Sequence, residues 1–264
     1  MFELIKSILS YRGFILSSVK REFQSKYKNS VLGVAWNILN PLAMIIVYTV
    51  IFSQIMRTRI PGSSSSFSYS IYLCSGLLMW TLFSEIVLRS QNVFIENANF
   101  IKKINFPKIC LPVIVIFNAL VNFFMFFALF LIFLIISGNF PGVVILAYVP
   151  IILTLIIFAI GLGTTTGILN VFFRDVGQGM TILVQFWFWF TPVVYSMDIL
   201  PPIAKTALAF NPVVGIITSC QKVMVNQQWP NWLDLLPALG TGILLVYLGL
   251  NLFRKHSSDM VDEL

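Results

Sequence analysis

Residues 109–173 decide the fold, because the run ICLPVIVIFNALVNFFMFFALFLIFLIISGNFPGVVILAYVPIILTLIIFAIGLGTTTGILNVFF holds 65 residues without a charge. One straight helix of that length would be about 98 Å long, roughly three times the hydrocarbon thickness of a bilayer. The run must therefore fold back, and the turn is expected at residues 137–142 (SGNFPG), its only strong cluster of helix breakers. The stretch predicts two membrane-spanning helices, 109–136 and 143–170.

The composition of the whole chain agrees with this class. Of 264 residues, 58% are hydrophobic and 10% are charged, where a soluble domain has about 25% charged residues. Such a sequence excludes a soluble domain, a disordered chain and a disulfide scaffold. The three cysteines are scattered, without metal-ligand spacing, and are expected to be buried free thiols. We therefore predict an all-α polytopic membrane protein.

Four more spans complete a single transmembrane domain over residues 1–264. Charge-free runs predict the spans 33–56, 178–197 and 234–253. The span 69–91 carries Glu85 and Arg89, which lie four residues apart and can pair on one helix face. The chain thus has six predicted spans.

The basic residues predict the orientation of these spans. With the N-terminus in the cytoplasm, thirteen Lys and Arg residues fall in inside segments and four in outside segments. Basic residues collect in cytoplasmic loops, so both termini are expected in the cytoplasm. The first 28 residues are too polar for a cleaved signal peptide.

Two amphipathic segments are expected at the cytoplasmic interface. Residues 1–28 place Ile15, Leu16 and Val19 on one side of a helix, which serves either as an anchor or as a collar that takes force from a partner. Residues 93–106 form the other helix, with Phe100 and Ile101 as exposed apolar anchors. This helix either floats at the interface or docks into a cleft of a cytosolic subunit.

The segment 198–228 lies on the outside in this topology. Sixteen uncharged residues, 206–221, are too apolar for a watery loop and too short to span, and Asn211-Pro212 interrupts them. We therefore expect a re-entrant hairpin of two half-helices. Trp229 and Trp232 fit an interfacial belt at its end.

The sequence lacks the residues that several kinds of catalytic and metal sites require. The single histidine, His256, argues against a serine hydrolase or a histidine metal site, and we predict no catalytic residue, metal or cofactor. Gly161–Gly167 (GLGTTTG) lacks the lysine of a phosphate loop, so the chain is not expected to hydrolyse ATP by itself. The spacing Gly163-x-x-x-Gly167 instead predicts close helix packing.

Residues 186–190 (FWFWF) are the most unusual stretch. Trp187 and Trp189 would lie about 14–17 Å deep, near the midplane, where an interfacial belt does not explain them. The rings either pack the core or form a cavity wall along which sugar rings slide. On the residues alone packing is favoured, because five successive rings point all around a helix. Pro192 predicts a kink directly after them.

Five motifs in order carry a resemblance to a known family. They are residues 28–36 (KNSVLGVAW) leading to Asn40-Pro41-Leu42, residues 102–107 (KKINFP) with Leu111-Pro112, residues 173–176 (FRDV), residues 191–196 (TPVVYS), and Leu200-Pro201-Pro202 with Asn211-Pro212. Together they resemble the membrane subunit of bacterial ABC-2 type exporters, in the branch that exports O-antigen, capsular or teichoic-acid polysaccharides.

The resemblance implies a homodimer in the bacterial inner membrane, with two copies of a separate ATPase, membrane lipids around it and no nucleic-acid partner. It favours the cavity wall over packing, and implies a substrate channel lined by aromatic residues: Trp187, Trp189, Phe190, Tyr195, Trp36 and Tyr48. It implies contact with the ATPase through Phe100, Ile101, Lys102, Arg174 and Asp175. It implies an outer gate at Pro201, Asn211 and Pro212.

The leading hypothesis is therefore the channel-forming subunit of an ATP-driven exporter of a lipid-linked polysaccharide. The alternative within transport is an exporter of a smaller lipid or drug. A membrane enzyme acting on lipid-linked sugars is disfavoured by the missing acid pairs and histidines. An ion channel or secondary carrier usually carries intramembrane charges, and here only Glu85 and Arg89 qualify, as an expected structural pair.

Overall fold

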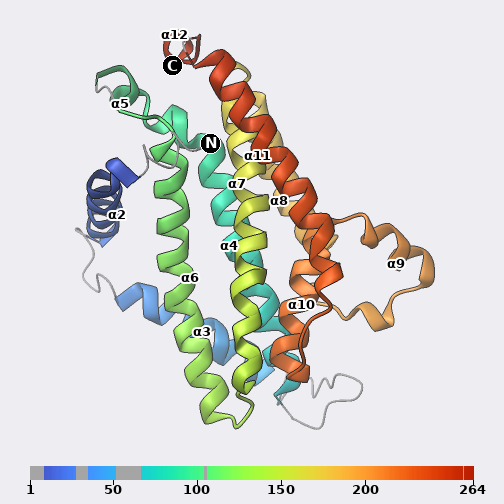
Figure 1. Ribbon diagram of the computed structural model, residues 1–264. Coiled ribbons are helices and arrows are strands. Elements are labelled where there is room, and N and C mark those ends of the chain that lie inside the picture. The colour runs from blue at the N-terminus through green and yellow to red at the C-terminus, as the bar shows by residue number, and fades with distance from the viewer. Residues whose placement is uncertain (1–8, 28–34, 52–66, 104–105, 258) are drawn as a thin grey trace.

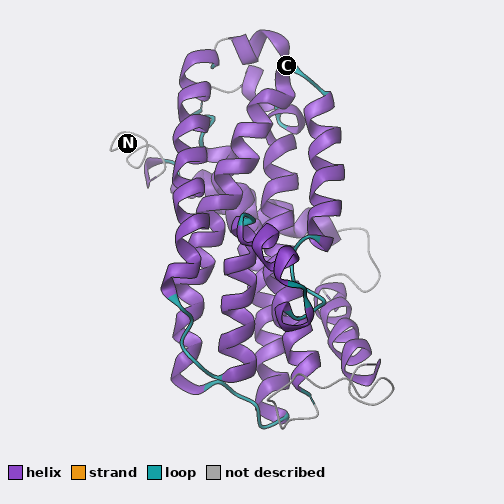
Figure 2. Cartoon of the chain, turned by 90° about the vertical axis from the view of Figure 1, so that its right-hand side faces the viewer, coloured by secondary structure: helices purple, strands orange, loops and turns teal. Residues whose placement is uncertain are grey.

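The computed structural model describes residues 9–27, 35–51, 67–103, 106–257 and 259–264. Within these ranges every regular element is a helix (Figure 2). The α-helices are α2 (Arg12–Tyr27), α3 (Trp36–Thr49), α4 (Ser68–Glu96), α5 (Ala98–Lys103), α6 (Cys110–Ile136), α7 (Tyr148–Phe172), α8 (Asp175–Trp189), α9 (Pro202–Ala209), α10 (Pro212–Asn226), α11 (Leu236–His256) and α12 (Asp259–Glu263). Short 3-10 helices are η3 (Gly142–Ala147), η4 (Met197–Ile199) and η5 (Trp232–Leu235).

The long helices α4, α6, α7 and α11 run side by side along the bundle (Figure 1). Helix α7 is central and packs against both α4 and α11. Helix α2 lies against α6 on one flank, and α9 projects from the opposite flank (Figure 1). Helices α5 and α12 lie at one end, called here the α5 end, where the Phe172 ring also packs on His256 with centroids 5.7 Å apart.

In the part of the chain that the structure describes, four helical stretches are long and apolar enough to cross a membrane: Ser68–Glu96, Cys110–Ile136, Gly142–Phe172 and Trp232–His256. They match four of the six predicted spans, and the turn expected at residues 137–142 separates two of them. The other two predicted spans correspond to shorter helices. Helix α3 has 14 residues and α8 has 15, and residues 33–34 and 52–56 of the predicted span 33–56 fall outside the described residues.

The predicted fifth span, 178–197, is shorter than expected. Helix α8 ends at Trp189, and the Thr191 amide donates to the carbonyl of Phe188 at 3.2 Å in place of a regular helical bond. The cause is Pro192, which has no N–H to donate and whose ring collides with the carbonyl four residues earlier. A full break therefore replaces the expected kink.

The break expected at Asn211-Pro212 is present. Helices α9 and α10 meet there at an angle of 107°. Residue 212 is the first residue of α10, the position in which proline is best tolerated because the first N–H groups of a helix have no internal partner. This gives the two half-helices that the sequence predicts.

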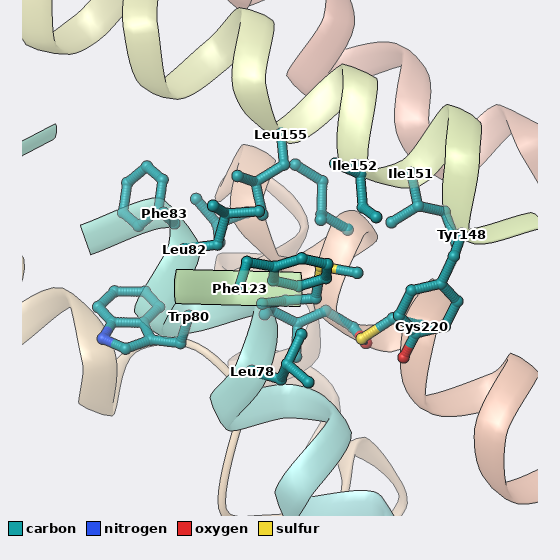
Figure 3. Packing of buried hydrophobic residues seen from close by; sticks show 14 of the residues in the cluster. Leu78, Trp80, Leu82, Phe83, Phe123, Tyr148, Ile151, Ile152, Leu155 and Cys220 are labelled. Carbon is teal, nitrogen blue, oxygen red and sulfur yellow. The ribbon is translucent and has the colours of Figure 1, made fainter. Parts of the chain in front are cut away.

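The main core lies where α4, α6, α7 and α10 meet. Figure 3 shows Leu78 and Phe83 of α4 and Phe123 of α6 in one cluster with Ile151 and Leu155 of α7. The side chains form one continuous apolar cluster with almost no contact with solvent. Cys74 and Cys220 belong to it, and all three cysteines are free and buried, as the sequence predicts.

Glycines allow α7 to approach its neighbours closely. A Cβ atom built on Gly163 would lie 2.6 Å from the Cβ of Ser90 in α4, and one on Gly167 would lie 2.5 Å from the Ser90 carbonyl oxygen. On the opposite side, a Cβ on Gly161 would lie 2.8 Å from the backbone of Val246 in α11. The close packing predicted from the Gly163-x-x-x-Gly167 spacing is confirmed.

The segment 93–106 is divided differently from the prediction. Helix α4 continues to Glu96, and only the six residues of α5 form a separate helix. The reason is burial: Val93 and Phe94 pack with Phe106, Cys110 and Leu111 in a second apolar cluster at the α5 end. Residues 104 and 105 lie outside the described ranges.

A charged cluster fixes α2 against the bundle. Arg89 of α4 forms ion pairs with Glu22 of α2 and, at 3.3 Å, with Glu85, so the predicted pair of Glu85 and Arg89 is confirmed. Asn118 and Asn122 of α6 donate to Glu22 and Glu85 at 2.5 and 2.6 Å. Ile15 of α2 is buried in the cluster at the α5 end, whereas its predicted companion Leu16 is exposed.

Candidate substrate path and docking surface

The aromatic stretch at the end of α8 is divided between the core and the surface. Trp187 packs edge-on against Phe83 and Phe158, with ring centroids 5.5 and 6.2 Å apart. Trp189 and Phe190 are 63% and 64% exposed. Trp187 therefore occupies the packing position, and its two predicted companions lie on the open face.

Asn211 joins the end of α8 to the start of α10. Its Oδ1 accepts from the indole Nε1 of Trp187 at 2.9 Å and from the Val213 amide at 3.0 Å, which caps α10. Its Nδ2 donates to the Phe190 carbonyl and to Thr191 Oγ1 at 2.9 and 3.1 Å. The predicted gate residue Asn211 and the predicted channel residue Trp187 are thus in direct contact.

Side chains of α4 and α10 satisfy the backbone after α8 breaks. The Tyr72 hydroxyl donates to the carbonyls of Pro192 and Tyr195 at 3.1 and 2.7 Å, and Gln221 Nε2 donates to Pro192 at 2.9 Å. Unpaired backbone carbonyls are costly away from water. These bonds therefore stabilise an irregular segment of backbone inside the bundle. Tyr195 belongs to this segment and is held in place through its backbone carbonyl.

One face of α8 is left open by the fold. Phe186, Trp189 and Phe190, at i, i+3 and i+4, are exposed side by side. Gln178, toward the α5 end, and Gln185, next to Phe186, are exposed on the same helix. The buried side of α8 consists of Gly177, Met180 and Val184, so the open face combines aromatic rings with amide groups.

The remaining predicted channel residues lie on α3, which contacts α4 and α6. Trp36 is half-exposed and lines a pocket of about 250 Å³ together with Asn40, Glu85 and Asn122. Tyr48 is partly buried against the main core. These two residues therefore belong to a different part of the bundle from the end of α8.

The predicted docking residues are only partly exposed. Phe100 is 38% exposed, with the guanidinium of Arg21 5.6 Å from its ring centroid. Ile101, also predicted as an exposed anchor, is buried in the cluster at the α5 end, because α5 turns this side chain toward Val93 and Phe106. That expectation for Ile101 is wrong.

Lys102, Arg174 and Asp175 are exposed in the same part of the molecule. Arg174 and Asp175 form the turn from α7 into α8, with Asp175 in the first helical turn, where a negative charge is favoured. Nearby, Lys108 donates to the Ser257 carbonyl at 2.7 Å, and its partial burial lowers its pKa. The α5 end is thus a polar surface assembled from several helix ends.

A polar pocket of about 260 Å³ lies between α4, α7 and α8 at this end. Its lining is dominated by amide, hydroxyl and guanidinium groups, those of Gln91, Asn92, Asn170, Gln178, Thr181 and Arg174. The sequence interpretation did not single out the amide residues. The available signal was the position of Gln91 and Asn170, which are polar residues at the ends of two predicted spans, 69–91 and 143–170.

Pro201 and Pro212 are the other predicted gate residues, and each lies at the start of a half-helix. Pro201 has extended backbone angles directly before α9, and Pro212 opens α10. The exposed side chains of Ile203 and Phe210 lie on α9 and directly after it. The two prolines therefore define the ends of the hairpin arms, and Asn211 is the residue that attaches the hairpin to α8.

Comparison with known proteins supplies the family. The model of the ABC-2 type transporter family matches residues 14–225. The chain is 27% identical to the O-antigen export system permease protein RfbA of Myxococcus xanthus over 100% of both chains. It is 30% identical to an RfbA protein of Klebsiella pneumoniae over 89% of this chain and 88% of the relative.

A more distant relative is the polysialic acid transport protein KpsM of Escherichia coli, 22% identical over 91% of this chain and 92% of the relative. The family match covers the helices from α2 to α10, and so includes the open face of α8, the hairpin and the α5 end. The helices described above are therefore those of a membrane transport protein, and the chain belongs to the ABC-2 type transporter family.

Proposed function

We propose that this chain is the membrane-spanning subunit of an ATP-driven exporter that moves a lipid-linked polysaccharide across the bacterial inner membrane. The observation that carries the proposal is the similarity to O-antigen export permeases along the whole chain. ATP hydrolysis belongs to a separate ATPase subunit, as in the family. The chain contributes the path through the membrane.

The open face of α8 supports a place for that path. Amide side chains such as Gln178 and Gln185 are unfavourable against lipid, and polar groups within a membrane normally face a water-filled cavity or another protein segment. Exposed rings at Trp189 and Phe190 add apolar surfaces on which a sugar ring can lie without fixed hydrogen bonds. We assign the channel wall to this face, with Phe186 beside the predicted residues.

The same face supports a homodimer. One chain leaves α8 and α3 with broad exposed surfaces, and a channel closed on all sides needs a second wall. Two copies of the chain, each bound to one ATPase, would enclose the path between two such faces. Trp36 and Tyr48 of α3 stay proposed channel residues in this arrangement.

The α5 end is the proposed docking surface for the ATPase, and lies in the cytoplasm together with both termini. Phe100, Lys102, Arg174 and Asp175 are the exposed groups there. At the other side of the break in α8, the α9–α10 hairpin is the proposed outer gate, anchored by Asn211 to the channel wall.

The test is deletion of the gene for this chain in its own host, followed by an assay of which leaflet of the inner membrane holds the lipid-linked polymer. The proposal predicts that a lipid-linked polymer, detected by lectin or antibody, accumulates in the cytoplasmic leaflet and disappears from the cell surface. Export of the polymer at the normal level, with loss of a lipid or drug from the outer leaflet instead, would assign the chain to an exporter of smaller molecules.

A further inference from the structure

We propose that the polar pocket between α4, α7 and α8 binds one sugar unit of the transported polymer, as a recognition subsite at the entrance of the path. The inference rests on the proposed function and adds where the substrate is recognised. It starts from the amide network that builds the pocket and from one polar atom that the network leaves unpaired.

The orientation of two buried amides is fixed by the backbone. Asn170 Oδ1 accepts from the Gly177 amide at 2.9 Å, and its Nδ2 donates to the Gln91 carbonyl at 3.0 Å. Gln91 Nε2 donates to the Gly177 carbonyl at 3.3 Å and to Thr181 Oγ1 at 3.1 Å. Because a backbone N–H only donates and a carbonyl only accepts, neither amide can be turned over without losing these bonds.

The fixed network leaves the side-chain oxygen of Gln91 without a partner. Gln91 is 1% exposed, and its Oε1 is buried and accepts no hydrogen bond from any described residue. Buried polar atoms are nearly always paired, so an exception calls for a ligand or a function. Gln91 lines the pocket, and a donor group that reached Oε1 on a small shift of the pocket wall would complete the site.

The pocket as a whole selects the chemistry of that group. No carboxylate is among the described residues that line it, and Gln178 adds an exposed amide that can both donate and accept. A phosphate dianion offers acceptors only, so it would pair with the Arg174 guanidinium but would be repelled by Gln91 Oε1, whereas a sugar hydroxyl donates and accepts and can pair with both. The volume of about 260 Å³ lies below the range typical of drug-sized ligands and suits a single sugar ring.

The placement of the pocket agrees with a role in recognition. Gln178 and Thr181 lie on α8, the helix that carries Phe186 and Trp189 toward its other end. Arg174, at the proposed ATPase-docking turn, lines the same pocket. A polymer that entered here would pass from amide groups to aromatic rings along one helix.

The experiment uses the assembled exporter, the chain with its ATPase in detergent, and lipid-free polysaccharide released by mild acid from the host's own surface polymer. Calorimetric titration gives the Kd. Gln178→Leu removes an exposed amide that bonds to no described residue, so the fold is preserved. Loss of one or two hydrogen bonds should raise the Kd about threefold to tenfold. The matched control Gln24→Leu, an exposed glutamine of α2 outside the pocket, should leave it unchanged.

Two results would overturn the subsite. One is an unchanged Kd in Gln178→Leu, or no binding by the wild type, while the wild-type exporter still moves polymer in cells; the pocket then holds only water. The other is displacement of the polysaccharide by inorganic phosphate, which would assign the pocket to an anion. Absence of polymer export by the wild type is a separate outcome, and it would remove the proposed function itself.

Discussion

Single residues in this chain differ between a role in holding the fold and the role proposed for them in the substrate path. Trp187 and Trp189 are two positions apart, yet one packs on Phe83 and donates to Asn211 whereas the other is exposed. The break at Pro192 makes this division possible, because the backbone leaves the helix directly after the rings. Five adjacent aromatic residues therefore serve two purposes.

Replacement of each tryptophan by leucine separates these purposes. Trp187→Leu should lower the free energy of unfolding by about 3 kcal/mol, because a large core ring and its hydrogen bond are both lost. Trp189→Leu should unfold at the normal temperature and lower the export rate. Thermal unfolding of the purified chain and polymer export in cells are the two measurements. Equal destabilisation by both substitutions would contradict the division.

Two glycines offer a second matched pair. Gly167→Ala would place a Cβ 2.5 Å from the Ser90 carbonyl oxygen and should destabilise the chain by about 1–3 kcal/mol through overpacking. Gly179 of α8 has open space around the same position, so Gly179→Ala should stabilise by up to about 1 kcal/mol through helix propensity. Thermal unfolding measures both, and an unchanged melting temperature for Gly167→Ala would refute the close contact of α4 with α7.

At the scale of elements, apolar runs predict the long helices well, whereas their ends depend on contacts that the sequence hides. The turn at residues 137–142, the hairpin break at Asn211-Pro212 and the close packing at Gly163 follow from local chemistry. The extension of α4 to Glu96 does not, because it depends on packing against residues 106–115. The amide network of Gln91 and Asn170 joins residues 79 positions apart, and no local sequence pattern predicts it.

Helix α5 tests the proposed docking surface with two adjacent residues. Phe100→Asp should release the ATPase in detergent while the chain stays folded, since the Phe100 ring is partly exposed. Ile101→Asp should lower the melting temperature of the chain alone, since a charge would be buried in the cluster at the α5 end. Co-purification and thermal unfolding report the two effects, and retention of the ATPase by folded Phe100→Asp would make α5 a simple interfacial helix.

For the whole molecule, the distribution of basic residues predicts one orientation of the bundle. The thirteen-to-four ratio of Lys and Arg places the loops next to α5 and α12 on one side of the membrane. The proposed docking residues and the polar pocket belong to this same end, and the turn between α6 and α7 lies at the opposite end (Figure 1). In the proposed orientation, a cytoplasmic ATPase would reach the α5 end only.

Cysteine labelling in intact cells measures this orientation. Phe140→Cys, in the turn between α6 and α7, should react with an impermeant maleimide, and Lys255→Cys, near the end of α11, should react only after lysis. Both positions are exposed, and the three native cysteines are buried, which keeps the background low. The reverse labelling pattern would show the opposite orientation in the membrane and would contradict the proposal that the ATPase docks at the α5 end.

The most direct test of the central claim is translocation in a purified system. The chain and its ATPase are reconstituted into vesicles that carry lipid-linked polysaccharide in the leaflet that faces the ATPase. A polysaccharide-cleaving enzyme present only on the opposite side of the membrane reports the arrival of polymer in the other leaflet. The account predicts ATP-dependent transfer that requires both proteins and that falls with Trp189→Leu. Transfer by the chain without the ATPase, or no transfer of polymer by the complete complex in the presence of ATP, would contradict it.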